Sequence, residues 1–294
     1  MKLLMFRVEG GRRLGALRPG GTDETHEVVE LPELADLRAL IAAGDEGLAH
    51  VRSALSSSRS KSHRLADLDL LAPLDPPHGN VIAIGRNYQK HAEETAHIDG
   101  SEPSPPTVFT KAITSLTEPF ADIVLDPSIS DKLDWEVELA VLIGRRGANI
   151  GRADALEHVF GYTVLNDVTA RDIQSGWGGQ YFKGKSLDRS CPTGPWVVTR
   201  DEVDDPQALD LFLRVNGTLK QEGNTRDMIY PVEAIIEWAS KGMTLLPGAM
   251  IATGTPDGVG FARTPPEFLK AGDVMETEVQ GIGLLRNRIV SAAG

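Results

Sequence analysis

The sequence predicts an α+β, mostly β protein in which a small N-terminal α/β domain precedes a larger β-rich domain. Most apolar segments are short, many alternate with polar residues, and glycine, proline, asparagine or aspartate bounds them, as is typical of strands. Only a few segments have helical spacing. A proline-rich connection near residues 73–79 separates parts of different character. We therefore expect domains at 1–75 and 76–294.

The N-terminal part is expected to contain two strands followed by helical segments. The segments KLLMFRVEG and GRRLGALRP favour two short strands around the turn Gly10-Gly11. Helical spacing follows at Leu34, Leu37, Leu40 and Ile41. Gly44 is a suitable end for that helix, and EGLAHVRSALSSS predicts a second one. The segment HRLADLDLLAP then predicts a strand that leads into the proline-rich connection.

The larger part is expected to be a mixed or antiparallel β architecture with few helices. VIAIG predicts a strand, NYQKHAEETA a helix, and the proline-rich DGSEPSPPTVF a connection. Further strands are predicted in DIVLD, WEVELAVLIG, GYTVLNDV, GPWVVT, LFLRVNG, AMIATG, VMETEVQGIG and LLRNRIV. Two more helices are predicted in RADALEHVFG and PVEAIIEWASKG, the second beginning at Pro231 and stopping at Gly242.

Composition and charge exclude several classes of protein. The formal net charge of −12 disfavours nucleic-acid binding. The apolar start reaches Arg7 and Glu9 too early for a signal peptide, and no apolar run has membrane-spanning length. Cys191 is the single cysteine and is interpreted as structural, so an intrachain disulfide is impossible. No nucleotide-binding glycine motif is present. We expect a soluble cytoplasmic protein that binds neither nucleic acid nor membrane.

Two glutamates interrupt the apolar segment DWEVELAVLIG. On a strand, Glu136 and Glu138 project from the same face, where like charges repel each other. A divalent cation such as Mg²⁺, Mn²⁺ or Ca²⁺ offsets that repulsion. Asp167, at the end of YTVLND, is available as a third ligand, whereas Asp172 is interpreted as a turn or cap residue. The alternative is an exposed edge strand whose glutamates form salt bridges.

Other segments contain candidates for acid–base chemistry and substrate binding. His91 and Glu94 share a helix face, which suits a general base whose tautomer is fixed by a carboxylate. Lys183 and Lys185 flank a glycine and are candidates to stabilise an oxyanion. The loop ATGTPDGVG offers backbone N–H groups and Thr255 for a carboxylate. Each feature has an alternative interpretation. The histidine and glutamate would lie at the surface, the lysines would be solvated loop residues, and the glycine-rich loop would be only a tight turn.

Seven segments in order resemble the fumarylacetoacetate hydrolase family over roughly residues 80–290. They are GRNYQKHAEE, DWEVELAVLIG, GYTVLNDVTARDIQ, FKGKSLDRSCPTGP, LRVNGTLKQEGNTRDMIYP, LLPGAMIATGTPDGVG and LKAGDVMETEVQGIGLLRN. The resemblance implies a mixed β-sheet roll or barrel-like catalytic domain, a small N-terminal domain, a Mg²⁺ or Mn²⁺ cofactor and a homodimer.

The resemblance also implies roles for particular residues. Glu136, Glu138 and Asp167 match three carboxylate ligands of the metal. The positions matching catalytic groups are His91, Glu94 and Lys185. The positions matching substrate contacts are Gly254, Thr255, Arg171 and Gln174, the last two being either structural or in contact with substrate. Two departures are Arg86, where leucine is frequent, and Asp257, where small residues are frequent. Arg86 is expected near the mouth of the site as a further substrate-binding residue, and both departures bear on which acid substrate fits.

The resemblance implies a divalent-metal-dependent hydrolase that cleaves a carbon–carbon bond in a 1,3-diketo acid, of the acylpyruvate or fumarylacetoacetate type. In that expectation His91 activates a water, Lys185 stabilises the departing enolate, and the segment 88–98 closes over the site. One alternative is a decarboxylase or keto–enol isomerase of a 2-oxo acid such as oxaloacetate, with the same metal site. Another is a non-catalytic module that a metal only stabilises.

Overall fold

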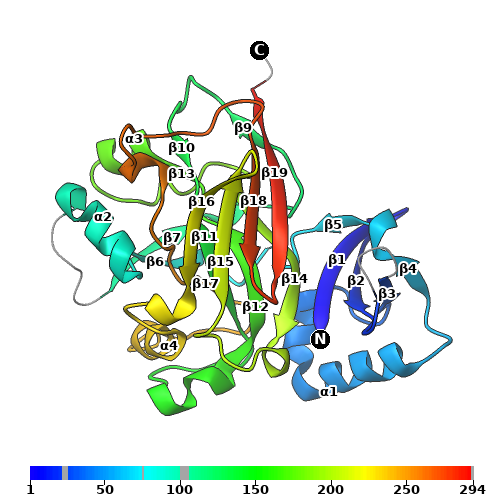
Figure 1. Ribbon diagram of the computed structural model, residues 1–294. Coiled ribbons are helices and arrows are strands. Elements are labelled where there is room, and N and C mark those ends of the chain that lie inside the picture. Colours follow the sequence, from blue (N-terminus) through cyan, green and yellow to red (C-terminus); the bar gives the residue numbers. More distant parts are fainter. Residues whose placement is uncertain (22–25, 75, 100–105, 293–294) are drawn as a thin grey trace.

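The expected α+β, mostly β fold is confirmed (Figure 1). The computed structural model describes residues 1–21, 26–74, 76–99 and 106–292. Residue 75, within the predicted proline-rich connection, and residues 100–105 of the second proline-rich stretch lie outside this range. Among the described residues no helix is long and apolar enough to span a bilayer.

A long mixed sheet runs through both the N-terminal part and the larger part. Its order is β4-β3-β2-β1-β14-β12-β11-β17-β6-β7, with β5 beside β1 and β8 beside β14. Its strands are β1 Lys2–Val8, β2 Gly11–Leu17, β3 Glu27–Glu30, β4 Ser62–Arg64, β5 Asp69–Leu71, β6 Val81–Gly85, β7 Thr107–Lys111, β8 Leu116–Thr117, β11 Val137–Ile143, β12 Val159–Asn166, β14 Cys191–Thr199 and β17 Met250–Ala252.

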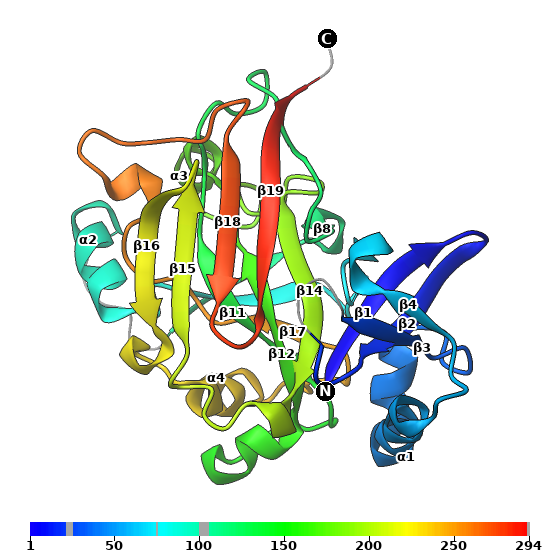
Figure 2. The same cartoon turned by 45° about the vertical axis from the view of Figure 1, so that its right-hand side comes forward.

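A second sheet covers one face of the long sheet in the larger part. Its order is β16-β15-β18-β19-β9. Its strands are β9 Ile123–Leu125, β15 Asp210–Val215, β16 Thr218–Asn224, β18 Val274–Val279 and β19 Gly283–Ser291. A short ladder pairs β10 Leu133–Asp134 with β13 Thr169–Ala170. Figures 1 and 2 show β15, β18 and β19 lying over β11, β12 and β14, so a closed apolar layer forms between the sheets.

The helices lie outside the two sheets. They are α1 Leu37–Ser56, α2 Gln89–Asp99, α3 Arg171–Gly176 and α4 Val232–Ala239. Gly44 has φ 56° and kinks α1, so the two helical segments expected there are continuous apart from this break. Gly242 follows α4 with φ +67°, as the predicted stop requires.

Two sequence-based expectations about local structure are wrong. Residues Arg152–His158 form a 3₁₀ helix rather than an α-helix. Only Ala155 in it is buried, so the segment has no apolar stripe that would stabilise full α-helical turns. The strand expected in HRLADLDLLAP is split into β4 and β5 by a 3₁₀ turn at Leu65–Asp67.

The strand β11 is buried on both faces, which explains its continuous apolar run. Val137, Leu139 and Val141 face the layer between the sheets. Ala140 and Leu142 face the opposite layer, which also contains residues of α1 and β1. Because side chains alternate along a strand, Glu138 lies on the face of Ala140, away from the second sheet. The carboxylate is therefore directed into the protein.

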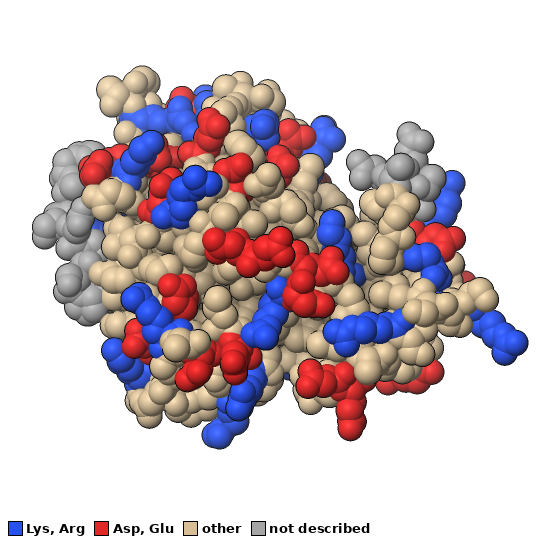
Figure 3. Space-filling view, turned by 60° about the horizontal axis from the view of Figure 1, so that its bottom comes forward, with Lys and Arg blue, Asp and Glu red and all other residues tan. Residues whose placement is uncertain are grey.

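The N-terminal strands join the larger part through β1 and β14, whose register pairs Lys2 with Val198 and Leu3 with Val197. One sheet therefore crosses the expected boundary near residue 75, and the division into domains stays a prediction (Figure 2). On the face in Figure 3, acidic and basic side chains are interspersed rather than sorted by sign. The homodimer and the cytoplasmic location stay predictions.

Candidate active site

Three buried carboxylates meet where β11 begins and β12 ends. Ligand oxygens of Glu136, Glu138 and Asp167 all lie within 4.8 Å of one another. Glu136 stands one residue before β11 rather than in it, yet the backbone N–H of Asp167 donates to its carbonyl over 2.9 Å. The three side chains therefore lie together, as expected. Their burial excludes the alternative, an exposed edge strand with salt-bridged glutamates.

Asn166 holds the backbone beside the carboxylates. Its Oδ1 accepts from the N–H of Glu136 at 3.0 Å, and its Nδ2 donates to Thr277 Oγ1 of β18 at 2.9 Å. These bonds tie the irregular residue before β11 both to the neighbouring strand and to the second sheet. Because Asn166 is fully buried, its polar atoms need such partners. The spacing of the carboxylates is thus fixed by the fold.

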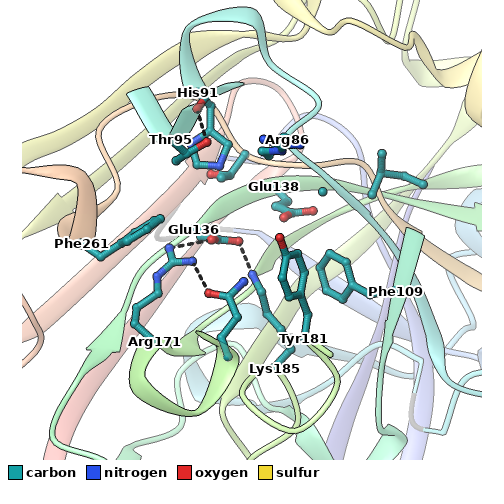
Figure 4. Close-up of a pocket in the computed structure, with 14 residues that line it drawn as sticks. Arg86, His91, Thr95, Phe109, Glu136, Glu138, Arg171, Tyr181, Lys185 and Phe261 are labelled. Atoms are coloured by element: carbon teal, nitrogen blue, oxygen red, sulfur yellow. Dashed lines mark hydrogen bonds and ion pairs between the residues drawn. The ribbon is translucent and has the colours of Figure 1, made fainter. Parts of the chain in front are cut away.

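Two of the predicted site cations are ion-paired with these carboxylates. Lys185 Nζ donates to Glu136 Oε2 at 2.6 Å and to Asp167 Oδ2 at 2.8 Å. Arg171 Nη2 lies 2.7 Å from Glu136 Oε1, and its Nε donates to Asp134 Oδ2 at 2.8 Å. Figure 4 shows Arg171 and Lys185 reaching Glu136 from the same side. Lys185 is therefore a buried bridge between two carboxylates and not a solvated loop lysine.

A third cation, Lys111, also pairs with these carboxylates. It was not predicted from the sequence. Its side chain is fully buried, its Nζ lies 2.6 Å from Asp167 Oδ1, and it donates to the backbone carbonyl of Lys185. The segment VFTK offered one signal, a lysine closing an apolar strand. Spacing along the chain does not show that this lysine meets Asp167, which is 56 residues away in the numbering.

The carboxylates have different titration behaviour because their partners differ. Burial raises the pKa of Glu138 well above its usual range, and the charges of Asp167 and Glu136 raise it further. Burial acts in the same direction on Glu136, but Lys185 and Arg171 outweigh it and lower the pKa of Glu136 to about 2. Glu138 is therefore the member of the group with the weakest cationic support.

The three carboxylates fit a divalent cation. Glu138 Oε2 accepts the backbone N–H of Gly254 at 2.8 Å, but among the described residues no ion pair compensates its negative charge, whereas Glu136 and Asp167 each pair with two cations. A cation between Glu138 and its two neighbours would supply that compensation, and an all-oxygen donor set suits Mg²⁺ or Mn²⁺. The residues present therefore match the type of ion that the family resemblance implies.

The predicted histidine–glutamate pair is formed on α2. His91 Nδ1 lies 2.7 Å from Glu94 Oε1, and the same carboxylate accepts the N–H of Gly258 at 3.0 Å. With Nδ1–H donated to Glu94, Nε2 is the ring nitrogen that can accept a proton. His91 is buried and lines the pocket beside the carboxylates, while Glu94 lies behind it.

The loop after β17 connects the carboxylates to α2. Gly254 has φ +98° and donates to Glu138, and Gly258 donates to Glu94. Between them, Thr255 Oγ1 accepts from Gln221 Nε2 at 2.8 Å, which leaves its hydroxyl proton available for a ligand. The glycine-rich segment is therefore part of the site, as expected, rather than only a connection between elements.

One small pocket collects most of the predicted site residues (Figure 4). It encloses about 390 Å³, including space open to solvent. The residues that line it are Ile84, Gly85, Arg86, His91, Thr95, Phe109, Glu136, Glu138, Arg171, Gln174, Tyr181, Lys185, Thr255 and Phe261. Lys183 and Asp257 are not among them. Gln174 Oε1 accepts from Arg171 Nη1 at 3.0 Å, so these two residues support each other.

Asp134 and Phe261 are further site residues that sequence reasoning missed. Asp134 is fully buried, pairs with Arg171 Nε and accepts the N–H groups of Gly260 and Phe261 at 2.7 and 3.0 Å. The Arg171 guanidinium stacks 4.0 Å from the centre of the Phe261 ring. Asp134 begins the segment DWEVE, so it was visible but not interpreted. Cys191 is buried, which raises the pKa of its thiol to about 12, and its structural role stays a prediction.

Comparison with known proteins identifies the family. The family model described as the C-terminal domain of fumarylacetoacetate hydrolases matches residues 80–290, the range that contains the whole pocket. The chain belongs to the fumarylacetoacetate hydrolase family. A solved structure with a TM-score of 0.85, fumarylacetoacetate hydrolase from Exiguobacterium antarcticum, is 37% identical and covers 99% of this chain and 100% of its own.

Curated members of the family are similar to this chain over most of its length. Oxaloacetate tautomerase YisK of Bacillus subtilis (strain 168) is 44% identical over 260 residues, covering 85% of this chain and 84% of its own. The human mitochondrial oxaloacetate tautomerase FAHD2A is 38% identical over 301 residues, covering 99% and 92%. Both relatives are named as oxaloacetate tautomerases, the reaction type given above as an alternative, and not as hydrolases of carbon–carbon bonds.

Proposed function

We propose that this chain is a divalent-metal-dependent tautomerase that interconverts the keto and enol forms of a 2-oxo acid of the oxaloacetate type. One observation carries the proposal: the His91–Glu94 pair and the carboxylates Glu136 and Glu138 lie at the same small pocket. The names of relatives that are 44% and 38% identical select this reaction among those that such a site supports.

Tautomerisation needs a proton to leave C3 of the substrate and a proton to reach the oxygen on C2. The C3–H bond breaks, its electron pair forms the C2=C3 double bond, and the carbonyl π pair moves to the oxygen. Nothing is oxidised or lost. His91 Nε2 takes the C3 proton, and Glu94 holds the ring in the tautomer that this requires. The enolate oxygen on C2 takes a proton from water, and His91 gives its extra proton back to water, so that the enol forms and the base is restored. The reverse reaction returns the proton to C3.

The other pocket residues bind and orient the acid. Thr255 donates its hydroxyl proton to the substrate carboxylate, supported by Gln221. Arg171, with Gln174 against it, and Lys185 add positive charge next to the developing oxyanion. A Mg²⁺ or Mn²⁺ ion held by Glu136, Glu138 and Asp167 would act as a Lewis acid on the 2-oxo carboxylate end.

The test is turnover by metal-stripped protein before and after Mg²⁺ or Mn²⁺ is restored. We expect the enol absorbance of freshly dissolved oxaloacetate to relax faster only with metal, without release of carbon dioxide. Pyruvate formation would instead indicate decarboxylation. Cleavage of an acylpyruvate into two acids would indicate hydrolysis. Metal binding without any of these reactions would leave the metal-stabilised module as the better account.

A further inference from the structure

We infer that Arg263 is a positioning residue for the proposed base His91, on which it acts through Gly258 and Glu94. The inference rests on the proposed function and adds to the same site a residue from outside the pocket. Arg263 follows the 3₁₀ turn Gly260–Ala262, and it is not among the residues that line the pocket. Any effect of its side chain on proton transfer therefore has to pass through other groups.

The backbone carbonyl of Gly258 is held by two side chains. Arg263 donates to it from Nη2 at 3.2 Å and from Nε at 3.4 Å, and Trp135 donates from Nε1 at 3.2 Å. Arg263 Nη2 also donates to the carbonyl of Lys220 in β16 at 2.6 Å. Hydrogen bonds from a charged donor are stronger than those between neutral groups. Arg263 therefore ties Gly258, in the loop after β17, to the second sheet.

The backbone of Gly258 lies directly against the strand that Arg263 holds. A Cβ atom at Gly258 would lie 2.3 Å from the carbonyl oxygen of Lys220, the same oxygen that accepts from Arg263. Trp135 approaches from another direction, since it stands immediately before the proposed metal ligand Glu136. Gly258 is thus fixed between β16 and the start of the strand that carries the carboxylates.

The N–H of Gly258 passes this fixed position on to Glu94. It donates to both carboxylate oxygens, over 3.2 Å to Oε1 and 3.0 Å to Oε2, and Oε1 lies 2.7 Å from His91 Nδ1. Among the residues that the structure describes, these two groups are the hydrogen-bond partners of the Glu94 carboxylate. When Gly258 shifts, the carboxylate can turn, and His91 then loses the acceptor that keeps its proton on Nδ1.

The remaining contact of Arg263 is too weak to explain its placement. Its Nη1 lies 3.9 Å from Glu267 Oε1, and the two side chains are 30% and 42% exposed. Ion pairs of this kind contribute little free energy, because solvent screens them. The contacts that matter are those to the carbonyls of Gly258 and Lys220. Glu267→Gln therefore supplies a matched control, since it removes the ion pair and leaves both carbonyl contacts in place.

The test measures deuterium incorporation at C3 of oxaloacetate by the metal-loaded full chain. Arg263→Met keeps the apolar stem and removes the donors to Gly258. We expect kcat to fall about 10-fold, the size of one hydrogen-bonded contact to the base, with KM and metal affinity within about twofold of wild type. Arg263→Lys, which keeps a charged donor, should restore most of the rate, and Glu267→Gln should leave it unchanged.

A double-mutant cycle distinguishes action through Glu94 from general loosening of the loop. In a Glu94→Gln background the carboxylate is already lost, so Arg263→Met should lower kcat by less than about twofold further. The same fold-change in both backgrounds, an unchanged kcat in Arg263→Met, or a loss of metal affinity in that variant would overturn the role of Arg263.

The imidazole Nδ1–H signal of His91 in NMR spectra tests the same link without substrate. Comparison with His91→Ala assigns the signal, and its exchange with solvent should be about 10-fold faster in Arg263→Met, because the hydrogen bond to Glu94 is less persistent. Unchanged exchange of this proton overturns the role of Arg263 alone. A wild-type protein that incorporates no deuterium with Mg²⁺ or Mn²⁺ present overturns the proposed function instead.

Discussion

The side chains of Lys111 and Asp167 form a fully buried ion pair at the base of the site. Burial of a charge without a partner is costly, so each charge in this cluster depends on the others. Lys111 also donates to the backbone carbonyl of Lys185, and Lys185 in turn bridges Asp167 and Glu136. Lys111 therefore supports both a proposed metal ligand and a proposed catalytic cation.

Replacing Lys111 tests this dependence. Lys111→Met keeps the apolar stem but leaves Asp167 Oδ1 buried without a cation, and we expect the metal-free protein to lose about 3–5 kcal/mol of unfolding free energy. Urea denaturation measures the loss. The control is Lys183→Met, at an exposed lysine two residues before Lys185. A loss below about 1 kcal/mol in Lys111→Met would contradict the account.

At the residue scale, sequence reasoning found side chains that share a local pattern. The E-x-E pair and the histidine–glutamate pair were visible because their members are two and three positions apart, a spacing that places both on one face of a strand or helix. Lys111 and Asp134 were missed because their partners come from distant strands and loops. Periodicity does not show which buried positions face each other across a sheet.

At the scale of elements, the loop after β17 links the proposed metal ligands to the helix that contains His91. Gly254 donates to Glu138 and Gly258 donates to Glu94, so one short segment positions both halves of the proposed chemistry. A Cβ atom at Gly254 would lie 2.7 Å from Asn87 Cβ and 3.1 Å from the carbonyl oxygen of Ile84. The close approach of this loop to the turn after β6 thus requires glycine.

Alanine substitutions at two glycines with positive φ distinguish the energetic cost of backbone strain from the cost of steric crowding. At Gly242, φ is +67° and no atom lies within 4 Å of an added Cβ, so Gly242→Ala should cost about 1–2 kcal/mol. Gly254→Ala adds overpacking against Asn87 and should cost about 2–5 kcal/mol. It should also weaken Mg²⁺ or Mn²⁺ binding, measured by calorimetry. Equal costs, with metal affinity unchanged, would show that the loop does not position Glu138.

Most helices and strands were predictable from the sequence, and the wrong assignments have a common cause. Strands such as β11 and β12 were marked by apolar runs with clear boundaries, and the glycine expected to end the first helix became the kink of α1 at Gly44. The segment Arg152–His158 was assigned to an α-helix although it buries almost no side chain. Helical composition alone does not choose between α and 3₁₀ geometry in a short exposed segment.

At the scale of the whole molecule, the continuous sheet and the reaction were the least predictable features. Pairing between β1 and β14 joins segments almost two hundred residues apart, and no local pattern indicates it. The family was recognisable from its ordered segments, but hydrolysis was favoured where the names of similar proteins favour tautomerisation. One metal site and one base support both reactions, because fold and ligands do not by themselves determine the chemistry.

The most direct test of the proposed chemistry is deuterium incorporation at C3 of oxaloacetate by a His91→Ala variant loaded with Mg²⁺ or Mn²⁺. Because His91 is the proposed proton acceptor, the rate of incorporation should fall about 100-fold or more below that of the wild type. Metal affinity should stay within a few-fold of wild type, since the carboxylates are untouched. Deuterium incorporation at the wild-type rate, with metal bound, would contradict the assignment of His91 as the base.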